Sequence, residues 1–407
     1  MKRASVNIKS VSNFSKLIAG LAFVQLVNFL FSLILPIYIS AVEFAEFGIF
    51  ISIVFILSEI INAKLDIAVM LGKTVEIAEK IAISAIHVAV LGSLFAFLIT
   101  ASFLFFIPKM YALIPFVLLM YGIHQPILVL LNKQEKYGDI NVFRILQVLF
   151  TTSTTLILAQ QKINHALIIG FTFGILIATI YSCRFIVFKF DLEQLKKNWK
   201  TYDQFPKFGT WSSLVNNISR NSVPIVLAAF FSAQWVGLYS YATRLLNAPT
   251  GMYSNALSLI FFKNASELNN TALKSNVKKI SFITFAIGII PTFIFLFLGE
   301  SIFQFLFGNE WKEAGKTAQY LILWYFSGLL ASPISSILDI KFKLKFEFKY
   351  NIVLLVCRIS ALLIGGFFGQ FYTSILLFSI VGIVFNLYLF FYIQVHVLND
   401  DSTKIRA

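Results

Sequence analysis

The sequence predicts an all-α, polytopic integral membrane protein of about twelve transmembrane helices, arranged as two six-helix lobes around a central cavity. Composition, long apolar stretches and alternating basic segments carry this prediction. Of the 407 residues, 58% are hydrophobic and 13% are charged, and the mean hydropathy is +0.82. Soluble domains contain roughly 25% charged residues, and even a large soluble fold leaves about a quarter of its chain's surface exposed to water. The composition therefore excludes soluble enzymes, secreted disulfide scaffolds, disordered chains and nucleic-acid-binding proteins.

Twelve apolar stretches are long enough to cross a bilayer, because a spanning helix needs about 20 apolar residues. These stretches lie near residues 17–39, 47–63, 81–107, 110–131, 142–160, 165–188, 209–231, 235–262, 280–299, 314–340, 350–370 and 372–396. Each is apolar throughout, whereas outer-membrane strands alternate between apolar and polar residues. The stretches therefore favour helices over a β-barrel.

The basic residues alternate in step with the twelve predicted spans. If the N-terminus is cytoplasmic, 26 of the 33 Lys and Arg residues lie in inside segments, 4 lie in outside loops and 3 fall within spans. Cytoplasmic segments of membrane proteins are enriched in Lys and Arg. The pattern predicts a multi-pass protein of the cytoplasmic membrane with both termini in the cytoplasm. It also explains the net charge of +14 without a nucleic-acid partner.

The longest inside linker, 189–208, divides the chain into an N-terminal lobe, 1–188, and a C-terminal lobe, 209–407. The two lobes begin with loosely matching residues: Phe14, Lys16, Pro36 and Gly48 correspond to Phe205, Lys207, Pro224 and Gly237. Paired six-helix repeats are a common transporter plan, with the substrate site at their interface. Two lobes in one chain can form that cavity alone, so a monomer is expected.

Polar side chains within spans mark the expected cavity, because a charge at the centre of a spanning helix costs about 2.5–3.5 kcal/mol. They gather on the first two spans of each lobe. The substrate-binding candidates are Gln25, Asn28, Asn216, Asn217, Arg220, Arg244 and Asn247. The alternative is that such stripes only hold helices together through hydrogen bonds. The paired arginines favour an anionic ligand, and a guanidinium matches phosphate or pyrophosphate bidentately.

Two acidic residues of the second span are candidates for ion or proton coupling, namely Glu59 and Asp66. The alternative for Glu59 is an ion pair with one of the arginines. The alternative for Asp66 is an ion pair with Lys64 at the membrane interface. Pro249 and Gly251 interrupt the polar stripe of the eighth span and are the gate candidates, because broken helices serve alternating access. Arg358 is expected to extend its charge toward the inner membrane surface.

No motif for catalysis or cofactor binding is found. Gly72-Lys73-Thr74 and Gly315-Lys316-Thr317 lack the glycine that a phosphate-binding loop requires five residues earlier. Cys183 and Cys357 have no metal-site spacing. We therefore expect no metal, no cofactor and no ATP-driven step on this chain.

Several short segments resemble a known transporter family. They are Pro36, Phe44-Ala45-Glu46-Phe47-Gly48, Phe205-Pro206, Val236-Gly237-Leu238-Tyr239, Arg244-Leu245, Asn247, Pro249, Phe261-Phe262, Trp311 and Ala314-Gly315. In this order they resemble the polysaccharide-transporter branch of the multidrug/oligosaccharidyl-lipid/polysaccharide (MOP) exporter superfamily, which includes the Wzx-type O-antigen flippases. Many relatives carry Arg-Tyr-Asp after the second helix, where this chain has Lys64-Leu65-Asp66, so no substrate role is assigned to Lys64.

The resemblance implies a flippase rather than an enzyme. It would translocate undecaprenyl-pyrophosphate-linked oligosaccharide repeat units across the bacterial inner membrane by alternating access, for O-antigen, lipopolysaccharide or another surface polysaccharide. It also implies contact with the polymerase and glycosyltransferases of the same pathway. Two alternatives stay open. A MATE-like small-molecule antiporter would centre on acidic residues, and a polysaccharide polymerase or ligase would carry a large periplasmic loop.

Overall fold

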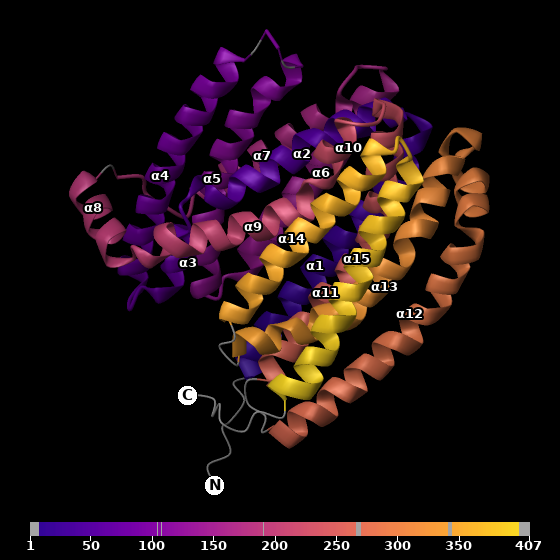
Figure 1. Ribbon diagram of the computed structural model, residues 1–407. Coiled ribbons are helices and arrows are strands. Elements are labelled where there is room, and N and C mark those ends of the chain that lie inside the picture. Colours follow the sequence, from indigo (N-terminus) through magenta and orange to yellow (C-terminus); the bar gives the residue numbers. More distant parts are fainter. Residues whose placement is uncertain are drawn as a thin grey trace. The chain divides into compact units, whose positions relative to one another are not determined.

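The computed structural model describes residues 8–103, 105–106, 108–189, 191–265, 270–340 and 344–398, and every regular element in these ranges is a helix (Figure 1). The α-helices are α1 (Ile8–Ile34), α2 (Ala41–Ile61), α3 (Leu65–Ala68), α4 (Val75–Ser102), α5 (Ile114–Lys133), α6 (Tyr137–Gln160), α7 (Ala166–Cys183), α8 (Leu192–Thr201), α9 (Thr210–Asn221), α10 (Val223–Ala228), α11 (Ala233–Ala265), α12 (Asn270–Phe307), α13 (Lys312–Ile340), α14 (Leu344–Phe367) and α15 (Phe371–Tyr392). Short 3-10 or π turns are η1 (Leu35–Ile37), η2 (Val69–Leu71), η3 (Lys109–Leu113), η4 (Phe205–Gly209), η5 (Asn309–Trp311) and η6 (Ile393–Val397).

Within these ranges, nine helical segments are long and apolar enough to cross a membrane: Ala19–Ile37, Ala41–Ile61, Val75–Ser102, Lys109–Lys133, Tyr137–Gln160, Ala166–Cys183, Leu273–Phe307, Phe348–Phe367 and Phe371–Val397. The prediction of an all-α, multi-pass membrane protein is confirmed. The other predicted spans, 209–231, 235–262 and 314–340, are also built from helices, and the count of twelve stays a prediction. The chain termini, predicted to be cytoplasmic, lie outside the described residues.

The chain packs as two compact units. The first contains the residues up to Ile39 and Glu46–Ser222, and the second contains Ser40–Ala45 and the residues from Val223 onward. The packing boundary thus follows α9, whereas the linker in the sequence suggested a boundary at residue 208. The assignment of six helices to each lobe stays a prediction.

In the first unit, α4 packs beside α5, and α6 packs beside both α7 and α1 (Figure 1). Two glycines of α7 permit the close approach of α6. A Cβ atom at Gly170 would lie 2.0 Å from the Thr155 hydroxyl oxygen, and one at Gly174 would lie 2.0 Å from that of Thr151. Small residues spaced four apart let membrane helices approach closely. Thr151 and Thr155 of α6 therefore form a packing surface against α7.

In the second unit, α13 packs against α11, α12 and α15, and α14 packs against α15 (Figure 1). A Cβ atom at Gly382 of α15 would lie 2.3 Å from Cδ1 of Trp324, so the indole of α13 fills the space that this glycine leaves. The same ring meets Phe378 edge-on, with centroids 4.9 Å apart. Aromatic packing thus organises the interior of this unit.

The predicted span 209–231 is a broken helix. It comprises α9, which ends at Asn221, and α10, which begins at Val223. Pro224 lies in the first turn of α10, and a proline has no N–H to donate to the carbonyl four residues earlier, so helical hydrogen bonding is interrupted here. The break leaves α9 as a separate twelve-residue helix with a polar face, and this helix contributes most of the candidate site in the first unit.

Candidate functional site

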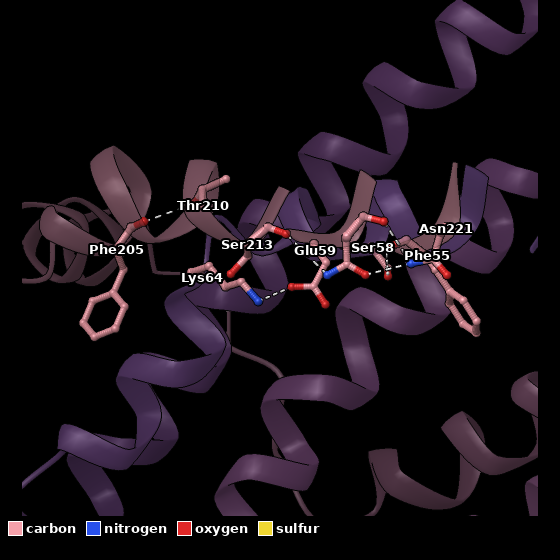
Figure 2. A network of polar contacts seen from close by, with 9 residues as sticks. Phe55, Ser58, Glu59, Lys64, Phe205, Thr210, Ser213 and Asn221 are labelled. Atoms are coloured by element: carbon pink, nitrogen blue, oxygen red, sulfur yellow. Dashed lines mark hydrogen bonds and ion pairs between the residues drawn. The ribbon is translucent and has the colours of Figure 1, made fainter. Parts of the chain in front are cut away.

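A charged turn follows α2 in the first unit. Ala63 and Lys64 both adopt left-handed backbone conformations, with φ of 47° and 58°. Non-glycine residues rarely adopt this conformation, and such strain concentrates at functional sites. The turn folds Lys64 back so that its Nζ pairs with Oε2 of Glu59 (Figure 2). The two side chains are only 12% and 24% exposed, so this ion pair is shielded from water.

The polar face of α9 lies beside this ion pair (Figure 2). Asn221 Nδ2 donates to the Asn217 side-chain oxygen at 3.0 Å, and Asn217 Nδ2 donates to the Ser213 carbonyl at 3.4 Å. Gly209, the residue before α9, lies close to the turn, since a Cβ atom built on it would lie 3.8 Å from Cβ of Lys64. We call Glu59, Lys64, Ser213, Asn217 and Asn221 the α2–α9 polar cluster.

Asp66 lies in α3, two residues beyond Lys64 and outside the spanning segments. Burial raises the pKa of its carboxyl above the usual value, Lys64 opposes this shift and Glu59 adds to it. Burial is the larger of these effects, so the charged form of Asp66 is disfavoured even with Lys64 nearby. The coupling role of Glu59 and Asp66 stays a prediction.

Asn62 lies between these acids in sequence and is buried. Its Nδ2 donates to the carbonyls of Ala85 and Gly122, at 3.2 and 2.9 Å. These bonds tie the end of α2 to α4 and α5. The charged turn is thereby attached to a rigid part of the first unit, so its geometry depends on the packing of three helices.

The predicted arginines belong to different units. Arg220 is exposed in the last turn of α9, and Asn216 on the same helix is half-buried. Arg244 is half-buried on α11 of the second unit, where Asn247 is exposed. The expectation that Arg220 and Arg244 face one cavity stays a prediction. Glu59, for which a pairing with an arginine was considered, is paired with Lys64 instead.

The remaining predicted residues lie elsewhere. Gln25 and Asn28 are half-buried on α1, where the Asn28 carbonyl accepts a hydrogen bond from Ser32 Oγ at 2.7 Å. Helix α11 continues through Pro249, and a Cβ atom at Gly251 would contact nothing within 4 Å among the described atoms. These residues leave room for bending at this point, and the gate role of Pro249 and Gly251 stays a prediction.

The structure contradicts the position that the sequence predicted for the Arg358 side chain. We expected this side chain to extend to the membrane surface, but it is only 7% exposed and lies inside the second unit. Its guanidinium carbon lies 5.3 Å from the ring centroids of both Trp324 and Phe378. Arginine stacks favourably on aromatic faces. No sequence pattern joins these three residues, which come from α14, α13 and α15.

The sequence profile of the family described as "Polysaccharide biosynthesis protein" matches residues 43–316. The lipopolysaccharide biosynthesis protein WzxC of Escherichia coli (strain K12) is 25% identical over 166 residues, which are 39% of this chain and 34% of that protein. The chain thus matches only about a third of that relative's length.

Two solved structures have a similar fold. The lipid II flippase MurJ, in an inward closed conformation, superposes with a TM-score of 0.72 at 16% identity, covering 91% of this chain and 86% of MurJ. An inward-facing multidrug resistance MATE family transporter of the MOP superfamily also gives 0.72, at 11% identity, covering 94% and 99%. Both are transport proteins by their titles, and neither is an enzyme. The profile match covers more than half of the sequence, and the chain therefore belongs to the polysaccharide biosynthesis protein family, with the fold of MOP-superfamily transporters.

Proposed function

We propose that this protein is a flippase. It moves undecaprenyl-pyrophosphate-linked oligosaccharide repeat units from the cytoplasmic to the periplasmic leaflet of the bacterial inner membrane, for O-antigen or another surface polysaccharide. The observation that carries the proposal is the combination of family membership with a fold similar, over 91% of the chain, to that of the lipid II flippase MurJ.

The side chains of α9 have the chemistry that such a substrate requires. Arg220 is exposed, and a guanidinium binds a pyrophosphate group bidentately. Asn216 and Asn217 are half-buried on the same short helix, and their amides can both donate to and accept from sugar hydroxyls. In the second unit, Arg244 and Asn247 of α11 likewise provide a guanidinium group and a side-chain amide.

The charged turn after α2 is the proposed coupling element. Protonation of Glu59 would release Lys64. The ammonium group of Lys64 would then pair with the carboxylate of Asp66. Because Lys64 and Gly209 are adjacent, this exchange acts at the entry to α9. A proton taken up at the turn can thereby alter the position of the helix that carries Arg220.

A deletion strain tests the proposed function. We expect loss of surface polysaccharide together with accumulation of complete lipid-linked repeat units on the cytoplasmic side of the inner membrane. Re-expression of the wild-type chain restores the surface polymer. If single repeat units instead reach the periplasmic face and stay unpolymerised, the protein is a polymerase or ligase and the flippase proposal is wrong.

A small-molecule antiporter is the second candidate, because the fold superposes equally well on a MATE transporter. It requires acidic residues in the transport path, and the shielded Glu59 meets that requirement in part. Changed drug susceptibility of the deletion strain, with normal surface polysaccharide, would favour this candidate. Contact with the polymerase and glycosyltransferases is part of the flippase proposal, and a monomer is its simplest form.

A further inference from the structure

A small pocket lies in the second unit, away from the residues discussed so far. Its volume is about 210 Å³. It is lined by Lys274, Val277 and Lys278 of α12, by Gln394 of η6 and by Leu398, the residue after η6. These helix ends belong to segments that the distribution of basic residues predicts to be cytoplasmic. The pocket therefore lies where spanning helices leave the membrane.

The floor of the pocket is apolar and its rim is cationic. Val277 and Leu398 belong to a buried cluster that also includes Leu273 and Ile393. Lys274 is half-buried and Lys278 is exposed. This combination suits an amphiphile, because apolar chains can contact the floor while an anionic group contacts the ammonium groups.

The wall formed by Gln394 is built from unusual backbone. Residues Ile393–Val397 form a π-turn, η6, which closes with a 3.0 Å hydrogen bond from Leu398 N to the Ile393 carbonyl. Such turns are uncommon and occur frequently at functional sites. Here the turn presents Gln394, a neutral donor and acceptor, opposite the two lysines.

The described lining of the pocket carries two positive charges, those of Lys274 and Lys278. None of the described residues that line it is acidic, and within the described ranges Lys274, Lys278 and the neighbouring Lys279 form no ion pair. Basic pockets between helices on the cytoplasmic side of a membrane bind anionic lipid head groups. The charge and the position together therefore indicate a phosphate-bearing ligand.

We propose that this pocket binds the phosphate head group of an anionic phospholipid from the cytoplasmic leaflet. Sites for drug-sized ligands have volumes of about 300–1,000 Å³, so this pocket suits a phosphate with its glycerol better than an oligosaccharide repeat unit. The ammonium groups of Lys274 and Lys278 contact the phosphate oxygens, Gln394 contacts the glycerol hydroxyls, and the acyl chains stay in the membrane. The proposal is independent of the transported substrate.

The test uses the full-length protein, purified in a neutral detergent and freed of native lipid. Phosphatidylglycerol and phosphatidylcholine are titrated separately, and bound lipid is counted by native mass spectrometry. We expect selective binding of phosphatidylglycerol. The double variant Lys274→Gln/Lys278→Gln should lower its affinity about 30-fold, since each Lys near an anionic surface contributes roughly a factor of five. Lys274→Arg/Lys278→Arg should bind within about threefold of wild type.

The matched control is Lys109→Gln/Lys162→Gln, which makes the same charge change at exposed positions in predicted outside loops of the first unit. It should retain wild-type affinity. Gln394→Leu keeps the charge and provides a second variant, with an expected loss of about fivefold for one hydrogen bond. Equal binding of both lipids, or an equal loss in the control, would overturn the proposal. Displacement of phosphatidylglycerol by stoichiometric inorganic pyrophosphate would assign the pocket to a free phosphate ligand and also overturn it.

Discussion

The two units shield a cation from water by different means. In the first unit, Lys64 is paired with the Glu59 carboxylate and lies near a second carboxylate, Asp66. In the second unit, Arg358 packs beside the rings of Trp324 and Phe378. A carboxylate loses its charge on protonation, whereas an aromatic ring keeps its quadrupole at every pH. The first arrangement is therefore suited to a reversible change of state, and the second to a permanent structural contact.

The largest effect is expected when the Arg358 contact is removed. Arg358→Ala deletes a buried side chain that packs beside two rings and should lower the free energy of unfolding by about 3 kcal/mol. Arg358→Met should recover most of this loss, because an apolar side chain of similar volume can replace a buried ion. Thermal unfolding of the purified variants in detergent measures both. Full loss of stability in Arg358→Met would show that the charge itself is required.

Arg220 provides the opposite case, a cation that is exposed. Arg220→Ala should leave the unfolding temperature unchanged and reduce surface polysaccharide about 30-fold, the effect of losing about 2 kcal/mol of charge-assisted hydrogen bonding to a pyrophosphate. The measurement is complementation of the deletion strain by membrane-inserted variant protein. Lys109→Ala, at an exposed predicted outside position, is the control. Normal polysaccharide in Arg220→Ala and in Arg244→Ala would remove both from the proposed site.

Breaking the ion pair of the first unit tests whether it is a switch. Glu59→Gln removes the anion that pairs with Lys64 and leaves the ammonium group shielded from water. It should lower the free energy of unfolding by about 1.5 kcal/mol. Lys64→Met alone should cost less, and the double variant should cost less than the sum of the two. A double-mutant cycle on unfolding free energies isolates this coupling. Additive effects would mean that the pair contributes nothing to the fold.

Asp66 should give the smallest change, and a change that depends on pH. Because burial raises the pKa of this carboxyl in the folded state, folding favours the protonated form. The associated stability is fully present below the unfolded pKa of about 3.9 and is lost as the pH rises through the folded pKa. Asp66→Asn mimics the protonated form.

The unfolding temperature of Asp66→Asn should therefore exceed that of wild type at about pH 8, by no more than about 3 °C. The difference should vanish below about pH 3, where the wild-type carboxyl is protonated in both the folded and the unfolded state. Glu193→Gln on the exposed start of α8 serves as the control and should show no such trend. A wild-type protein more stable than Asp66→Asn at pH 8 would mean that attraction to Lys64 outweighs burial.

Much of the fold was predictable because the free energy of transfer to a bilayer is nearly additive along a chain. Nine of the predicted spans coincide with helices of sufficient length and apolarity, since each apolar stretch satisfies its own backbone hydrogen bonds and needs no knowledge of its neighbours. The break near Pro224 in span 209–231 also has a local cause, because proline lacks the N–H that an uninterrupted helix needs.

The sequence by itself thus determined the all-α membrane class, the positions of the spans and the polar face of α9. Only the tertiary structure decided which charges meet. Glu59 pairs with Lys64 because two residues adopt left-handed backbone, a conformation that ordinary side chains do not signal. Arg358 contacts two rings because α13, α14 and α15 bring together residues that are far apart in the chain. Such contacts depend on how helices pack, and packing is a property of pairs of surfaces rather than of any single segment.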